Sequence, residues 1–234
     1  MTTQYRRWFR GFGVLGLAVM LTVLIAAGLA SRASAQPYAA LLMDARTGEI
    51  LSQTDNATAR LHPASLTKMM TLYIAFEALE NGEISEDTRV RISRHAAAQP
   101  PSRLGLRSGQ TIAFRYLIRA AALRSGNDAA AAIAEALEGS VANFAVRMNR
   151  TARAIGMSRT HFVNPHGLTA EGHLSSARDM AILARQLYFD FPDYYNIFSR
   201  MSDNAGIATV NNTNRLFLSS YRGGDGIKTG FTNA

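Results

Sequence analysis

The run Pro63-Ala64-Ser65-Leu66-Thr67-Lys68 opens a helical pattern that continues to Leu79. From Leu66 onward this pattern contains neither glycine nor proline and repeats its apolar residues at helical spacing, and Asn81-Gly82 ends it. Ser65 and Lys68 are three residues apart, so a helix start would point both side chains from one face. A neutral Lys68 amine could then take the proton of the Ser65 hydroxyl, which serine needs to lose to act as a nucleophile.

Lysine is rare in this chain. Of 25 basic residues, 23 are arginine and only Lys68 and Lys228 are lysine. Arginine stays charged at any working pH, whereas the pKa of a buried lysine shifts readily, so these positions favour an amine that can lose its proton. Biased codon supply would also leave few lysines, and the neighbours of each lysine decide between the two interpretations.

Two further short motifs could meet Ser65 in one cleft. Ser125-Gly126-Asn127 lies between two helical segments, where glycine allows a tight turn and the two polar side chains can face one side. Taken alone, this run is typical of a simple helix-helix turn with a capping residue. Lys228-Thr229-Gly230 lies on a predicted strand, where the glycine lets a ligand approach the backbone and the other two residues offer donors to a carboxylate.

Strand signals stand at both ends of the chain with helical signals between them. Residues 38–53 predict a β-hairpin around the turn formers Asp44 and Gly48, and β signals return at residues 207–210 and 226–231. Residues 89–109 predict a long, partly irregular loop. Helical periodicity marks residues 113–123, 128–137, 141–155 and 176–188. This order predicts an α+β domain whose sheet is completed by distant segments.

Residues 1–35 have the pattern of an export signal. Three arginines precede an uncharged apolar run at residues 11–30, and Ala33-Ser34-Ala35 is a small-x-small cleavage site. The run is also long enough to stay as an uncleaved anchor, which would hold the chain at the inner membrane. Removing this segment lowers the net charge from +8 to +4 (21 basic minus 17 acidic), which is too mild to argue for nucleic acid. With no cysteine, disulfides, thiol nucleophiles and thiolate zinc sites are excluded.

The three motifs S-x-x-K, S-x-N and K-T-G, in this order, are the signature of penicillin-binding proteins and class A β-lactamases. The chain resembles one family in particular, the serine-type D-alanyl-D-alanine carboxypeptidases, or low-molecular-mass penicillin-binding proteins, from about Tyr38 to its end. The matching stretches are residues 63–68, 123–129, 162–168, 176–180 and 225–230.

The resemblance implies a transpeptidase-like fold, with an antiparallel sheet and a mainly helical subdomain at about residues 86–200. Residues 36–234 would then form an incomplete catalytic domain that stops shortly after K-T-G and lacks the last sheet strands and the closing helix. The location implied is outside the cytoplasm, in the periplasm or on the cell-wall side. No cofactor is implied, and His161, His166 and His173 lack the spacing of a helical zinc site.

The mechanism implied is acyl transfer on a peptidoglycan stem peptide that ends in D-Ala-D-Ala. Ser65 would be the nucleophile and Lys68 the general base, while Ser125 and Lys228 would pass a proton to the departing D-alanine. Asn127 would hold the peptide amide. β-Lactam antibiotics would be trapped covalently on the same serine.

The K-T-G segment would supply the rest of the substrate site. Thr229 would bind the terminal carboxylate, Gly230 would leave room for the peptide, and the backbone N–H groups of Ser65 and Phe231 would form the oxyanion hole.

Other functions remain open at this stage. A serine β-lactamase shares the trio, but a class A enzyme would carry a Glu followed by Leu-Asn between the second and third motifs. Glu135, Glu138 and Glu171 lie there, and none has that setting. A D,D-endopeptidase would use the same machinery, and a fragment without activity or a wall-binding protein is a hypothesis of another class.

Overall fold

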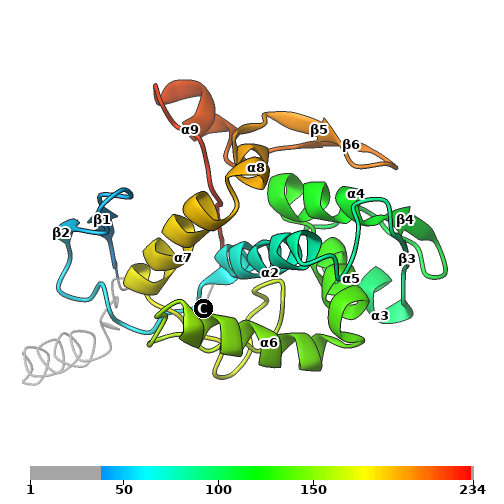
Figure 1. Cartoon of the computed structure of the whole chain (residues 1–234), viewed down its shortest axis with the longest axis horizontal. Coiled ribbons are helices and arrows are strands. Elements are labelled where there is room, and N and C mark those ends of the chain that lie inside the picture. Colours follow the sequence, from blue (N-terminus) through cyan, green and yellow to red (C-terminus); the bar gives the residue numbers. More distant parts are fainter. Residues whose placement is uncertain (1–37, 233–234) are drawn as a thin grey trace, which may run out of the picture. The chain divides into compact units, whose positions relative to one another are not determined.

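Helix α2, Lys68–Glu80, lies among the other helices of the computed structural model, which describes residues 38–232 (Figure 1). Ten of its 13 residues are buried, because the sequence is apolar on nearly every face and not on one stripe alone. Pro63 comes before a short 3₁₀ turn, η1 (Ala64–Thr67), that runs directly into the helix. The helix expected at residues 66–79 is therefore confirmed. The predicted leader at residues 1–35 lies outside the described residues.

Three helices of similar length pack on α2 and build the core with it. They are α5 (Asn127–Glu138), α6 (Val141–Ala154) and α7 (Ala177–Asp190), which agree with three of the predicted helical segments. Phe76 of α2, Phe144 of α6 and Leu183 of α7 are among the fully buried side chains of this core. α2 thus holds Lys68, its first residue and the last residue of the S-x-x-K motif, beside a buried apolar cluster.

The strands form three separate antiparallel pairs. The predicted hairpin near the N-terminal end is confirmed, with a turn at residues 45–47. The pairs are β1 (Leu41–Met43) with β2 (Ile50–Gln53), β3 (Arg89–Arg91) with β4 (Thr111–Ala113), and β5 (Ser202–Asn204) with β6 (Thr209–Asn211).

The strand expected at residues 226–231 is not formed, and this prediction is wrong for the described residues. Residues 222–232 contain no strand or helix. A strand is defined by backbone hydrogen bonds to a neighbour, and no segment within residues 38–232 supplies them to this run. The sheet expected to join distant segments is accordingly present only as the three separate pairs.

The region at residues 89–109 is more ordered than a loop. It contains β3 and the short helix α3 (Arg94–Ala97), whose start is capped by Ser93 Oγ accepting from Ala96 N–H at 2.9 Å. β3 pairs with β4, some twenty residues further along the chain, and local periodicity cannot reveal such a partner. Only residues 98–110 follow the predicted irregular path.

The helix expected at residues 113–123 is divided. Ala113 ends β4, α4 spans Phe114–Arg119, and a π-helical turn, η2 (Ala120–Arg124), follows. Four short elements in the last third were not predicted: α8 (Pro192–Tyr195), the 3₁₀ turn η3 (Asn196–Ser199), β5 and α9 (Arg215–Ser220).

Within residues 38–232 no single helix has the length and apolarity to cross a membrane. Taken together, α5 and α6 have the length and composition of a membrane-spanning segment, but the two helices meet at an angle of 84°. Both helices pack on α2 in the core.

Candidate active site

The S-x-x-K motif brings its hydroxyl and its amine together. Lys68 Nζ lies 3.2 Å from Ser65 Oγ and donates a hydrogen bond of 2.7 Å to the backbone carbonyl of His166. Ser65 sits in the η1 turn and Lys68 is the first residue of α2, so the change from 3₁₀ to α winding sets their relative position. The pair has the geometry of a nucleophile beside its base.

Lys68 is fully buried, and its surroundings disfavour the charged form. Burial is the main cause that holds the pKa of Lys68 well below its usual value, the charge of Lys228 is the second, and the charge of Asp128 opposes both. Burial also lowers the pKa of Lys228 to about 8. Both lysines of the chain are thus amines whose protons leave more readily than in water.

Lys228 Nζ and Ser125 Oγ are buried without a hydrogen-bond partner among the described residues. Buried polar atoms in native proteins are nearly always paired, and an unpaired one is costly. Only two other side-chain atoms of residues 38–232 share this condition, the Nε atoms of Arg115 and Arg147. Two unsatisfied groups from separate motifs indicate a place where a polar ligand binds.

The π-helical turn places Ser125 at the mouth of the cleft. η2 ends there, the Gly126 N–H donates to Ala120 O at 3.0 Å, and Ser125 adopts a left-handed conformation at φ 61°, ψ 36°. Non-glycine residues seldom adopt positive φ, and π-helical turns are often found at functional sites. The wide turn presents the Ser125 hydroxyl to the cavity instead of continuing the helix.

Asn127 begins α5 with its amide already oriented. Its Nδ2 donates to the carbonyls of Pro100 at 2.9 Å and Pro101 at 3.2 Å, and its backbone N–H donates to Ser102 O at 2.7 Å. Both amide hydrogens are therefore used, which leaves Oδ1 as the atom that can accept a hydrogen bond from a ligand.

The K-T-G segment runs beside the start of η1. A β-carbon on Gly230 would lie 3.3 Å from the Ser65 nitrogen, which is a tight contact, so glycine lets the two backbones run close together without it. Thr229 Oγ1 donates to Thr213 Oγ1 at 2.9 Å, and the Phe231 side chain is exposed.

These segments enclose a cavity of about 440 Å³. Six of the eight predicted site residues line it, while Lys68 and Lys228 are not among the lining residues and keep their amines buried. The lining residues are Ser65, Pro101, Ser102, Arg124, Ser125, Asn127, His166, Gly167, Leu168, Thr213, Thr229, Gly230 and Phe231.

The carbonyl of His166 is a contact that sequence reasoning missed, because a main-chain atom leaves no signature of its own. The loop that carries it is held by Asn164 Oδ1, which accepts from the N–H groups of His166 at 3.3 Å and Gly167 at 2.7 Å. Thr71 Oγ1 of α2 donates to Pro165 O at 2.6 Å. Burial lowers the pKa of His166 to about 3, so its ring is neutral at pH 7. In the sequence, this loop is indicated only by the run Asn164-Pro165-His166-Gly167, which separates two helical segments.

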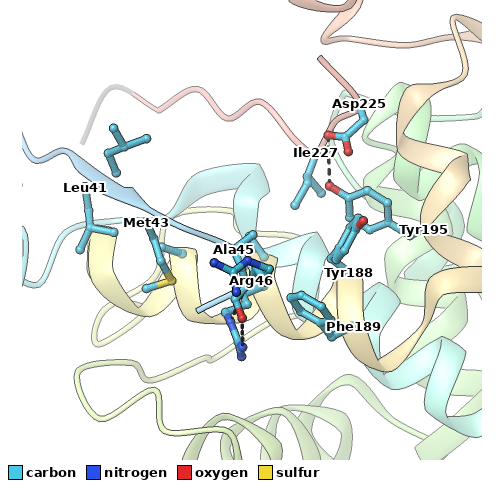
Figure 2. A pocket seen from close by; sticks show the side chains of 13 residues that line it. Leu41, Met43, Ala45, Arg46, Tyr188, Phe189, Tyr195, Asp225 and Ile227 are labelled. Atoms are coloured by element: carbon cyan, nitrogen blue, oxygen red, sulfur yellow. Dashed lines mark hydrogen bonds between the residues drawn. The ribbon is translucent and has the colours of Figure 1, made fainter. Parts of the chain in front are cut away.

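A larger cavity of about 670 Å³ lies between β1, α7 and residues 225–227 (Figure 2). None of the predicted catalytic side chains lines it, so size does not identify the site here. The Tyr195 hydroxyl donates to Asp225 Oδ1 at 3.4 Å across this space, and Ile227 points into it. These contacts hold the segment that leads directly into Lys228.

Residues 38–232 contain no group of three His, Asp or Glu side chains arranged to hold a metal ion. The reactive groups of the candidate site are the hydroxyls of Ser65 and Ser125 and the two buried lysine amines.

A serine beside a buried lysine, with a second serine lining the cleft and a second buried lysine in the segment that borders it, defines the active-serine class of penicillin-recognising proteins. The chain belongs to the D-alanyl-D-alanine carboxypeptidase family, whose sequence pattern matches residues 27–234.

Individual relatives agree with this assignment. D-alanyl-D-alanine carboxypeptidase DacF of Bacillus subtilis is 41% identical over 198 residues, which cover 82% of this chain and 50% of the relative. The crystal structure of penicillin binding protein 5 from Haemophilus influenzae matches with a TM-score of 0.79 and 35% identity, over 85% of this chain and 59% of that one.

Penicillin-Binding Protein D2 from Listeria monocytogenes, solved in its cefotaxime-bound form, matches with a TM-score of 0.73 and 32% identity, over 85% of this chain and 83% of that one. The penicillin-binding-protein fold expected from the motifs is therefore confirmed. The chain spans about half the length of the curated relatives it matches.

Proposed function

We propose that this chain is a serine-type D-alanyl-D-alanine carboxypeptidase that removes the terminal D-alanine from peptidoglycan stem peptides through an acyl-enzyme. The observation that carries the proposal is the contact of 3.2 Å between Ser65 Oγ and the buried Lys68 Nζ beside the cleft. Membership of the carboxypeptidase family supports the choice of substrate.

Acylation begins when the neutral Lys68 amine takes the Ser65 proton and Ser65 Oγ attacks the carbonyl between the last two D-alanines. The peptide C–N bond breaks, and the departing amine receives a proton through Ser125 and Lys228. The unpaired Ser125 Oγ and Lys228 Nζ support this assignment, since neither has a hydrogen-bond partner among the described residues. Water then hydrolyses the ester and regenerates Ser65.

The backbone N–H groups of Ser65 and Phe231 form the oxyanion hole in this proposal. The close approach of Gly230 to the Ser65 nitrogen supports it, because the residue after Gly230 then lies near the same oxygen position. Losing one oxyanion donor typically costs about 3 kcal/mol of transition-state stabilisation.

Substrate is held at two points. Asn127 Oδ1 is the free acceptor for an amide N–H of the peptide, since Nδ2 is used by the two proline carbonyls. Thr229 and the Lys228 ammonium bind the terminal carboxylate, and the Lys228 cation gains the anionic partner that the described residues do not provide.

β-Lactams would acylate Ser65 in the same way, and the existence of a relative in a cefotaxime-bound form supports the binding of such drugs. The purified chain should be labelled covalently by a fluorescent penicillin. Labelling of Ser65→Ala at the parent rate would show that another residue is the nucleophile. Release of D-alanine from a pentapeptide ending in D-Ala-D-Ala identifies a carboxypeptidase. Rapid turnover of penicillin would identify a β-lactamase, and cleavage of cross-linked dimers would identify an endopeptidase.

We also propose that the protein works outside the cytoplasm, in the periplasm or on the cell-wall side. The basic, apolar and small-residue pattern of residues 1–35 supports this, and an uncleaved leader would hold the chain at the inner membrane. A reporter enzyme that is active only outside the cytoplasm, fused after residue 234, should be active. An inactive but intact fusion would contradict export, and cell fractionation distinguishes anchored from released protein.

A further inference from the structure

The carboxylate of Asp128 is completely buried and is satisfied by four backbone N–H groups. Oδ1 accepts from Leu104 at 2.9 Å and from Ala129 at 2.9 Å, and Oδ2 accepts from Gly105 at 2.8 Å and Leu106 at 3.0 Å. No cation among residues 38–232 forms an ion pair with it. A buried carboxylate is tolerated only when its oxygens are hydrogen-bonded in this way.

An ordinary role at the start of a helix does not account for this arrangement. A carboxylate in a first helical turn usually accepts from its own helix, and here only the Ala129 bond is of that kind. The other three donors come from a segment more than twenty residues earlier in the chain. Asp128 therefore ties α5 to residues 104–106, which form neither helix nor strand.

The segment that Asp128 holds is continuous with residues 100–102, which contribute to the wall of the catalytic cleft. Pro101 and Ser102 line the cavity, and the carbonyls of Pro100 and Pro101 orient the Asn127 amide. Ser102 adds a second attachment, because its Oγ donates to Arg124 O at 2.8 Å. We name residues 100–106 the proline loop. Both ends of this loop are thus bound to residues 124–128.

We propose that Asp128 is a positioning residue, which holds the proline loop against α5 and thereby keeps Asn127 Oδ1 directed at the substrate amide. The proposal rests on the carboxypeptidase function given above. Without the carboxylate, three loop N–H groups lose their acceptor, the proline carbonyls move, and the Asn127 amide is free to turn. Replacing Asp128 by asparagine would set a donor against N–H donors, so the isosteric change is sufficient to release the loop.

The test compares two substrates and two variants. One substrate is the pentapeptide. The other is a depsipeptide in which an ester oxygen replaces the N–H group that donates a hydrogen bond to Asn127 Oδ1. Asp128→Asn should lower kcat/KM for the pentapeptide by about a hundredfold, the scale expected for a reacting group misplaced by about 1 Å. The depsipeptide should be much less affected, because it lacks the hydrogen bond that is lost.

Asp179→Asn is the matched control. Asp179 is equally buried, and its Oδ2 accepts from Arg159 N–H at 2.8 Å and Thr160 Oγ1 at 2.6 Å, but it does not line the cleft. This variant should lose thermal stability, but the ratio of kcat/KM for the pentapeptide to kcat/KM for the depsipeptide should not change. In a double-mutant cycle, Asp128→Asn should add nothing to Asn127→Ala, whereas Asp179→Asn should be additive with it.

Equal losses on both substrates, or full additivity with Asn127→Ala, would overturn the positioning role. Ser102→Ala at the exposed loop is a milder variant, and it should show the same substrate preference on a smaller scale if Asp128→Asn does not fold. Hydrogen exchange at the amides of residues 104–106 gives a readout without catalysis. Faster exchange in Asp128→Asn than in Asp179→Asn supports the attachment of the loop to α5, and equal exchange contradicts it. The proposed function is tested separately: it is contradicted if the parent chain is not labelled by penicillin and does not turn over substrate.

Discussion

Gly167 packs its α-carbon against the carbonyl oxygen of Ala64, so closely that a β-carbon at residue 167 would overlap that oxygen. Ala64 precedes the proposed nucleophile Ser65, and Gly167 follows His166, whose carbonyl accepts from Lys68. This one contact therefore sets the distance between the segment that carries the serine and the loop that holds the base. Gly167 also has φ +84°, a conformation that favours glycine.

Replacing Gly167 by alanine should both strain the backbone and push the two segments apart. We expect a loss of stability of about 1–3 kcal/mol and a large fall in the rate of penicillin labelling. Gly172→Ala is the control, because Gly172 has a similar φ of +76° but the nearest atom to its β-carbon would be 3.9 Å away. Equal labelling rates in the two variants would show that the Ala64 contact has no part in positioning Ser65.

Lys68→Arg should abolish acylation although the positive charge is kept. A guanidinium does not release its proton at any working pH, so it cannot act as the base for Ser65. Lys68→Met is the companion variant, since it fills the buried position without a charge. Thermal unfolding of both should show a folded protein, and labelling of Lys68→Arg at the parent rate would rule out Lys68 as the base.

The rate of acylation should depend on pH through both lysines. Lys68 acts as a base only when neutral, so the rate rises as the pH passes its pKa, which burial and Lys228 hold well below the usual value. Lys228 acts only when charged, so the rate falls as the pH passes its pKa of about 8. The two charges interact, and the apparent values therefore belong to the pair.

Lys228→Arg tests whether Lys228 causes the fall in the acylation rate at alkaline pH, the alkaline limb of the pH profile. An arginine stays charged throughout this range, so the fall above about pH 8 should disappear even if the maximum rate is lower. An unchanged alkaline limb would assign that titration to another group.

The stability of the fold should decrease in mild acid, and His173 is one of two buried histidines, with His166, that cause this. The Nδ1 atom of His173 accepts from Val163 N–H at 2.9 Å, so the proton lies on Nε2, which donates to Thr67 Oγ1 at 2.8 Å. Burial is the main cause that lowers the pKa of His173 from 6.5 to about 4. Between these values the unfolded chain takes up a proton that the native state refuses, and stability falls with pH by up to about 3 kcal/mol.

His173→Gln should reduce this dependence between pH 6.5 and 4, because it leaves a donor for Thr67 without a titrating ring. His166, whose pKa burial lowers to about 3, should account for most of the dependence that remains. Chemical denaturation at a series of pH values measures it. His161→Gln, at an exposed position, is the control. A slope that is unchanged in His173→Gln would show that other groups cause the acid sensitivity.

The features that could be predicted from sequence depend on neighbours along the chain. The helix after Pro63 and the hairpin around residues 44–48 follow from local spacing and turn chemistry. Ser65 and Lys68 belong to one turn, so their contact was also predictable. By contrast, β3 needs the partner β4, and the π-helical turn at residues 120–124 interrupts a run whose composition is that of an ordinary helix.

The sequence by itself determined the chemical groups of the site: two serines, an asparagine and the only two lysines, each in a recognisable motif. The tertiary structure decided what these groups can do. Burial beside Lys228 lowers the pKa of Lys68, two proline carbonyls select which atom of Asn127 faces the cleft, and Asp128 binds the N–H groups of residues 104–106 in the same loop. Solvation and hydrogen-bond direction depend on segments far apart in the chain, and residue spacing carries no record of them.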